Sequence, residues 1–210
     1  MLNLQKRNRA RTTQKILVAL EAELQASGLA KTGVNRVAER AGVSKVLIYR
    51  YFGSMEGLIA HYVKMSGTFP DYNEEEPQKT SKKTNLGKVW SDELLKNLRH
   101  FRQNPATREI LKSSFVVGDT VANSAYEALD AKRVRVIEHL LSGSEDADVV
   151  AVAGIILGGL AHLALLSEQQ KTLAGLSLNT AEGIKRTEKA VKTICEALNR
   201  KVDISSLEAA

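Results

Sequence analysis

The chain has 210 residues and a mass of 23.0 kDa, enough for one good-sized domain or for a small domain joined to a larger one. Hydrophobic residues at 43% and charged residues at 26% are typical of globular proteins and exclude wholesale disorder, a collagen-like fibre and a polytopic membrane protein. The single cysteine, Cys195, excludes an intrachain disulfide and a cysteine-based zinc site. The N-terminus lacks an apolar stretch of the signal-peptide type, so we expect a cytoplasmic protein.

The formal net charge of +6 is unevenly distributed. Residues 1–66 hold 11 Lys and Arg against 4 Asp and Glu, whereas the remaining 144 residues hold 19 against 20. A basic segment on a near-neutral body indicates a module that binds a polyanion, and nucleic acid is favoured over a membrane surface because phosphate contacts require Lys and Arg. The charge distribution alone is also compatible with a solvated basic tail that binds no partner.

The basic segment has the apolar spacing of short helices. Ile16, Leu20 and Leu24 form one stripe of a helix that ends at Gly28, and Gly42 ends a second helix. Residues Lys6 to Arg11 precede the first helix, and we expect them to form a loose basic arm. Ser44 can cap a third helix, and Ser54 with Glu56 can open a fourth. The predicted helices span 12–27, 34–41, 45–51 and 54–65.

The rest of the chain is also predicted to be helical. Residues 67–84 contain two of the three prolines and no periodicity, so we expect them to form a mobile connector. Beyond it, helices are predicted over 86–102, 105–115, 119–141, 149–166 and 180–198. The sequence therefore predicts an all-α fold of about nine helices, with an N-terminal three-helix helix-turn-helix head on a C-terminal helical body. The predicted domains are 1–66, the connector 67–84 and the body 85–210.

Residues 33–52 have the pattern of a helix-turn-helix. Ala38 and Ala41 are small enough for two helices to cross closely, and Gly42 relieves the sharp turn. In such a unit the second helix enters the major groove of DNA while the first lies across the phosphate backbone.

The run VNRVAERAGVSKVLIYRYFGSMEGLI resembles the TetR family of bacterial transcription regulators. The similarity covers Thr12 to Tyr62 and includes the turn Ala41 to Ser44, the Y-x-Y-F motif of Tyr49, Tyr51 and Phe52, and the following Glu56 and Leu58. The resemblance implies a divergent C-terminal body that dimerises and binds a ligand. Three residues depart from the family pattern where that family approaches DNA, and each change is expected to remove or reshape a contact: Gly33, Val46 and Met55.

Candidate DNA-contacting residues follow from position on the second helix of this motif. Four of them are expected to reach base edges: Lys45, Val46, Leu47 and Arg50. Four others are expected to contact phosphate, the two tyrosines because the family resemblance implies it: Arg36, Ser44, Tyr49 and Tyr51. The alternative is that Tyr49 and Phe52 only pack the small core.

The run 149–166 is apolar on all sides and just long enough to be a transmembrane helix. It lacks aromatic belts and flanking basic clusters, so we expect no membrane insertion. In a soluble protein such a helix must be covered by its own core and by a second copy of the chain. The predicted homodimer interface consists of Gly154, Gly158, Ala161, Ile184, Val191 and Leu198.

A ligand pocket among the middle helices is implied only by the family resemblance. The larger side chains available to line it are Trp90, His100, Phe101, Phe115, Tyr126 and His162, each of which could instead be ordinary core. Few charges mark the apolar faces, which favours a small and largely apolar effector.

The four histidines have no metal-ligand spacing, and the sequence contains no Walker loop and no nucleophile elbow. We therefore expect no enzyme activity, no metal and no cofactor.

The sequence thus predicts a homodimeric, ligand-responsive DNA-binding regulator, most simply a repressor that an effector releases from a pseudo-palindromic operator. Two alternatives remain open. One is a nucleoid or protein-interaction factor with a DNA-binding head and no effector, and the other is a small membrane-attached protein.

Overall fold

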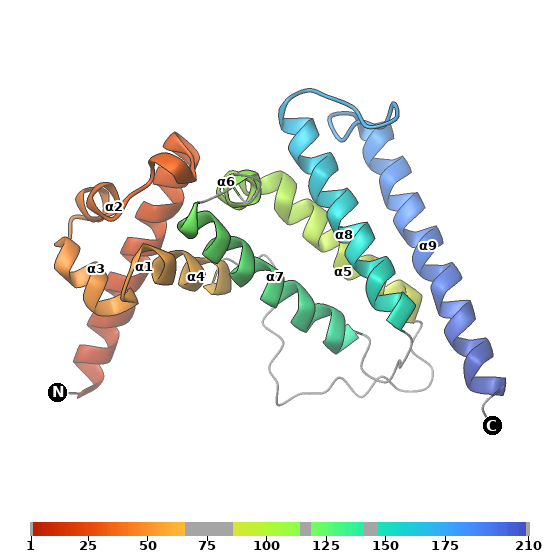
Figure 1. The fold of residues 1–210 in the computed structure, drawn as a ribbon, viewed down its shortest axis with the longest axis horizontal. Helices are drawn as coiled ribbons and strands as arrows, with labels where there is room; N and C mark the ends of the chain where they lie inside the picture. The colour runs from red at the N-terminus through yellow and green to blue at the C-terminus, as the bar shows by residue number, and fades with distance from the viewer. Residues whose placement is uncertain (1, 66–85, 114–118, 141–146, 209–210) are drawn as a thin grey trace. The chain divides into compact units, whose positions relative to one another are not determined.

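The computed structural model describes residues 2–65, 86–113, 119–140 and 147–208. These residues form nine α-helices and one short 3₁₀ helix, Leu29–Lys31, and no strand, which confirms the predicted fold class (Figure 1). The predicted connector 67–84 lies outside the described residues. The α-helices are α1 (Leu2–Ser27), α2 (Val34–Ala41), α3 (Lys45–Phe52), α4 (Met55–Met65), α5 (Leu86–Gln103), α6 (Pro105–Ser113), α7 (Thr120–Leu140), α8 (Ala147–Glu168) and α9 (Ala181–Glu208).

Glycine and side-chain acceptors mark the ends of several helices. Gly42 ends α2 with a left-handed backbone, φ 62°, that favours glycine. The Thr107 N–H donates to Asn104 Oδ1 at 2.9 Å, so Asn104 caps α6 and Pro105 occupies its first position. Asp119 Oδ1 accepts from the Val121 and Ala122 N–H groups and caps α7. These caps use side-chain acceptors to satisfy helix donors that have no partner within the helix.

The predicted basic arm is wrong. Helix α1 begins at Leu2, so Lys6, Arg7, Arg9 and Arg11 lie on its first turns. No proline or glycine interrupts residues 2–27, and Leu, Gln, Lys and Arg are all good helix formers. The predicted start at residue 12 came from the stripe of apolar residues. Such a stripe indicates which part of a helix is buried, but it does not indicate where the helix begins.

Contacts divide the chain into two compact units, one of residues 1–68 and 104–132 and the other of residues 69–103 and 133–210. Helices α6 and most of α7 therefore group with α1 to α4. This grouping differs from a linear division after residue 66, and the division into DNA-binding and effector-binding domains stays a prediction.

The core of the first unit is built by α1 to α4 with α6. Ile16, Leu20 and Leu24 of α1 are fully buried, as their spacing predicted. They share this core with apolar side chains of the other helices, including Val37, Ile48, Leu58, Ile59 and Ile110. Helix α1 packs against both α2 and α6, and α3 packs against α2 and α4. The buried face of each short helix fixes which face it leaves to solvent.

In the second unit, α5 packs against both α8 and α9. The cluster at its centre contains Trp90, Leu94, Leu98, Leu160 and Val191. Helix α8 was expected to be apolar all round, and its outer face is exposed, with Ile155 74% exposed. Residues 150–168 are long and apolar enough to span a membrane by composition, with 28% of that stretch buried in the chain. A core or interface helix of a soluble protein meets the same criterion.

Arg133 lies on the buried face of α7. Val134 is 45% exposed, whereas Ala125, Leu129 and Ile137 are buried. The buried positions recur at four-residue intervals, so Arg133 and not Val134 falls on that face. The Arg133 Cζ atom lies 5.9 Å from the centre of the Phe101 ring.

Candidate nucleic-acid interface

A rigid turn joins α2 to α3. Gly42 and Val43 follow α2 directly, and the Leu47 N–H donates to Ser44 Oγ at 3.3 Å, which makes Ser44 the N-cap of α3. Ile48 is the fully buried residue of α3 and anchors it in the core. This arrangement is a helix-turn-helix whose second helix is held by one face only.

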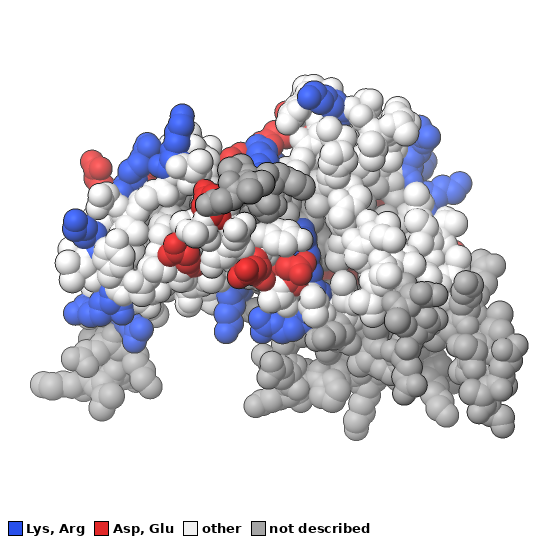
Figure 2. Space-filling view, in the orientation of Figure 1, with Lys and Arg blue, Asp and Glu red and all other residues white. Residues whose placement is uncertain are grey.

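The free face of α3 carries most of the residues predicted to contact DNA. Val46 is 68% exposed and Tyr49 is 49% exposed. Lys45 and Arg50 are exposed on the same helix, Leu47 and Tyr51 are half-buried, and Ser44 and Arg36 are exposed. In the view of Figure 2, Lys and Arg side chains gather over the end of the unit formed by α1, α2 and α3. A basic, protruding helix is the shape and charge that entry into a major groove requires.

The guanidinium groups of Arg9 and Arg50 lie next to the ring of Tyr51. The Arg50 Cζ atom lies 5.7 Å from the centre of the Tyr51 ring, and the Arg9 Cζ atom from α1 lies 5.0 Å from it. Arg9 was expected in a loose arm and was not predicted as a site residue. The sequence signal for it was the basic run before Thr12, which the structure places on a helix next to α3.

The three departures from the family pattern have different surroundings. Gly33 is the N-cap of α2 and, being glycine, supplies no side-chain cap. Val46 is exposed on α3, where a methyl group of thymine could meet it. Met55 is buried at 9% exposure, so it belongs to the core of the head rather than to a DNA contact. Phe52, also considered for the core, is half-buried and packs edge-to-face on His61 at 5.3 Å between ring centres.

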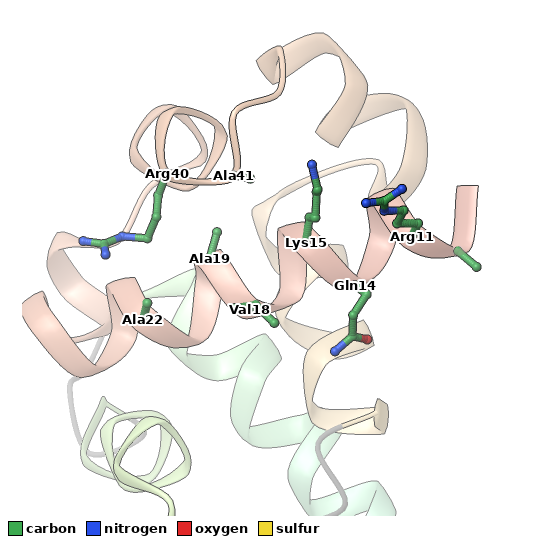
Figure 3. A pocket seen from close by; sticks show the side chains of 9 residues that line it. Arg11, Gln14, Lys15, Val18, Ala19, Ala22, Arg40 and Ala41 are labelled. Carbon is green, nitrogen blue, oxygen red and sulfur yellow. The ribbon is translucent and has the colours of Figure 1, made fainter. Parts of the chain in front are cut away.

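A groove of about 750 Å³ runs between α1 and the C-terminal end of α2 (Figure 3). Its apolar lining comes from alanines and from Val18, which is 55% exposed. Arg11 and Lys15 of α1 and Arg40 of α2 also line it. The positive charge of the head therefore extends from α3 along α1.

The predicted dimer residues separate into two groups. Gly154 and Gly158 are exposed on α8 and an added Cβ at either would meet nothing within 4 Å. Ala161 and Val191 are buried in their own unit, and Ile184 and Leu198 pack against its core. On α9, the outer face instead has a shallow groove lined by Arg186, Lys189, Ala190, Thr193 and Ile194. The outer face of α8 and these α9 residues are therefore exposed within the chain.

The predicted ligand residues are divided between the two units. Trp90 and Phe101 are buried in the second unit, and His100 is half-buried there. His162 is exposed on the outer face of α8, and Tyr126, at 41% exposure, belongs to the first unit. Phe115 lies outside the described residues. Within the described ranges, no three His, Cys, Asp or Glu side chains are grouped so that they could hold a metal ion.

Comparison with known proteins agrees with this geometry. Residues 16–62 match the family model of bacterial regulatory proteins of the tetR family. No curated protein sequence matches the chain.

Solved structures are similar in fold over most of the chain. The regulator FadR from Bacillus subtilis, solved with stearoyl-CoA, is 15% identical with a TM-score of 0.62, covering 87% of this chain and 96% of that one. NalD, the secondary repressor of the MexAB-OprM efflux pump of Pseudomonas aeruginosa, is 17% identical with a TM-score of 0.55, covering 74% and 86%. A TetR-like regulator from Rhodococcus sp. RHA1 is 16% identical with a TM-score of 0.55, covering 88% and 93%. The match over 16–62 includes the whole helix-turn-helix, so this part of the chain is similar to the bacterial regulatory proteins of the tetR family, and the solved structures show that the chain shares their fold.

Proposed function

We propose that the chain is a homodimeric repressor that binds a pseudo-palindromic operator through α3 and is released by a small, largely apolar effector. The observation that carries the proposal is the free face of α3, where Lys45, Val46, Tyr49 and Arg50 are exposed while Ile48 anchors the helix. Lys45 or Arg50 is suited to guanine, and Val46 to the methyl group of thymine. Arg36, Ser44, Tyr49 and Tyr51 are proposed to contact phosphate and set the register.

Dimerisation is supported by the outer face of α8. Val150 and Ile155 are exposed apolar residues, and Gly154, Gly158 and Gly159 beside them permit close approach of a second helix. An exposed apolar helix face of this length is unusual on a monomer. A twofold dimer would present two copies of α3 to DNA, and such dimers bind half-sites one duplex turn apart or a multiple of it.

An apolar effector is supported by the character of the helical body and by one similar structure. Apolar side chains, including Trp90 and Leu98, dominate the interior of the second unit. FadR from Bacillus subtilis, which shares the fold, was solved with stearoyl-CoA. The effector is proposed to favour a conformation in which the two α3 helices no longer match the operator, which requires it to bind that conformation more tightly.

The test is selection of DNA. Fragments of the source genome are incubated with the purified protein, and the bound fragments are recovered and sequenced. The proposal predicts enrichment of one inverted repeat whose half-sites are about one duplex turn apart. Recovery of fragments with no common sequence would contradict it and would favour a nucleoid factor. Failure to bind any duplex at low salt would exclude DNA binding altogether.

A further inference from the structure

A carboxylate is buried in the head at a position where the helix pattern calls for an apolar residue. Glu23 of α1 is 4% exposed and follows the buried residues Ile16, Ala19 and Leu20 on the same face. It faces α2, where Arg36 and Arg40 stand one helical turn apart.

Glu23 accepts a hydrogen bond from Arg40 and forms an ion pair with Arg36. The Arg40 Nε–H donates to Glu23 Oε1 at 2.6 Å. Arg36 Nε lies 3.1 Å from Glu23 Oε2 as an ion pair, but Oε2 accepts no hydrogen bond, so the Arg36 N–H is not aimed at it. The Glu23 side chain is 5% exposed, whereas those of Arg36 and Arg40 are 53% and 46% exposed. One buried anion therefore supports two cations that reach the surface.

This arrangement is a costly way to join two helices. Removing a carboxylate from water carries a large desolvation penalty, and apolar residues of similar volume often stabilise such a site as well or better. A guanidinium, however, has N–H groups beyond the one on Nε. Because Glu23 lies beside the Nε atom of each arginine, we expect the N–H groups on the Nη atoms to be available to an acceptor outside the protein.

We infer that Glu23 is a positioning residue for DNA binding, which holds Arg36 and Arg40 ready to contact phosphates along α2. This inference rests on the proposed function, because the first helix of a helix-turn-helix lies across the phosphate backbone. A long side chain loses rotamer entropy when it binds a ligand. Because Glu23 already restricts Arg36 and Arg40 in the free protein, less of that entropy is lost when DNA binds.

Net charge alone predicts the opposite effect. If the head bound DNA only through its net positive charge, the negative charge of Glu23 would weaken phosphate binding. Removal of that charge should then strengthen binding. The two accounts therefore differ in the sign of one measurement.

The experiment measures binding of full-length protein to a random-sequence DNA duplex between about 50 and 200 mM salt. Glu23→Gln keeps the shape of the side chain and removes its charge. We expect its affinity to fall about tenfold, with the slope of log K against log salt reduced in magnitude by about 0.9 for each phosphate that the variant no longer neutralises. In a protein that also carries Arg36→Gln and Arg40→Gln, Glu23→Gln should have no further effect on affinity.

Glu39→Gln is the matched control, because Glu39 is exposed on α2 and its substitution changes the net charge equally. It should raise affinity slightly, and circular dichroism of both variants checks that the head is folded. Equal or stronger binding by Glu23→Gln overturns the inference, as does weaker binding with an unchanged salt slope, which indicates a purely structural role. If the wild-type chain binds no duplex, the proposed function fails and the inference fails with it.

Discussion

The guanidinium of Arg9 lies over the ring of Tyr51, with 5.0 Å between the Arg9 Cζ atom and the ring centre. This contact joins the start of α1 to the end of α3, two segments about forty residues apart in the sequence that share one surface of the head. It places a cation of α1 beside the helix proposed to enter the major groove.

Arg9→Gln should weaken binding to all DNA sequences by a similar factor. The substitution removes a cation next to α3 but no proposed base contact, so the salt slope should fall by about 0.9 per head without loss of sequence preference. Titration of the selected operator and of a random duplex measures both quantities. Lys31→Gln, an exposed lysine outside α3, is the control. A loss confined to the operator would show that Arg9 reads sequence.

Lys45→Ala should reduce discrimination between operator and random DNA. Lys45 is exposed at the first position of α3, and removal of a specific base contact costs about 1–3 kcal/mol. The measurement is the ratio of the two dissociation constants at one salt concentration. An unchanged ratio, with both affinities equally reduced, would assign Lys45 to phosphate instead.

Gly57→Ala should destabilise the head. An added Cβ at Gly57 would overlap the backbone carbonyl oxygen of Phe52, and a backbone atom cannot move aside as a side chain can. We expect a loss of about 1–3 kcal/mol in the free energy of unfolding, measured by chemical denaturation. Gly33→Ala is the control, because a Cβ there meets nothing within 4 Å and φ is −131°, so it should cost only the weaker N-cap preference of alanine and destabilise the protein less than Gly57→Ala does. Equal effects of the two substitutions would contradict this packing.

Ile155→Glu should convert the proposed dimer to a monomer. Ile155 is 74% exposed at the centre of the outer face of α8, where a second copy would bury the new charge without a partner. Sedimentation velocity measures the change in mass. Val18→Glu, at 55% exposure on α1, places the same charge on another exposed apolar site and should leave the mass unchanged. A wild-type chain that sediments as a monomer, or an Ile155→Glu variant that remains dimeric, contradicts the proposed interface.

Cys195 should be nearly inert in the folded protein. It is 1% exposed, and burial raises the pKa of its thiol to about 11, with the nearby Glu196 adding to the shift. At pH 8 the folded thiol is protonated, whereas an unfolded thiol ionises from about pH 8.5. The folded state therefore loses stability as pH rises from about 8.5 towards 11. A thiol reagent should react slowly until denaturant is added, and rapid reaction at neutral pH would show that α9 opens or lies elsewhere.

Sequence reasoning was most successful in the head because its signals are local. Gly42 and Ser44 act through groups within a few residues of themselves, so their position alone predicted where α2 ends and α3 begins. The same reasoning placed the stripe of α1, Ile16, Leu20 and Leu24, in the core. It also found, in a short run around the turn, the resemblance to the TetR family that the family model matches over residues 16–62.

Long-range relationships were not predictable in the same way. Periodicity assigns a face to a residue but does not say which helix covers that face, so Glu23 showed no sign in the sequence of meeting Arg36 and Arg40. Val191 has the spacing of an interface residue, but α5 covers it within the chain. The side chains expected to form one ligand pocket are divided between two units, because nothing in their helical spacing specifies which helices are neighbours.

The most direct test of DNA binding through α3 is protection of guanine N7, an atom in the major groove, when the protein is bound to its selected operator. We predict two protected clusters related by twofold symmetry, about one duplex turn apart on one face of the DNA, and loss of that protection with Lys45→Ala or Arg50→Ala. Unprotected N7 atoms on fully bound DNA would contradict entry of α3 into the major groove.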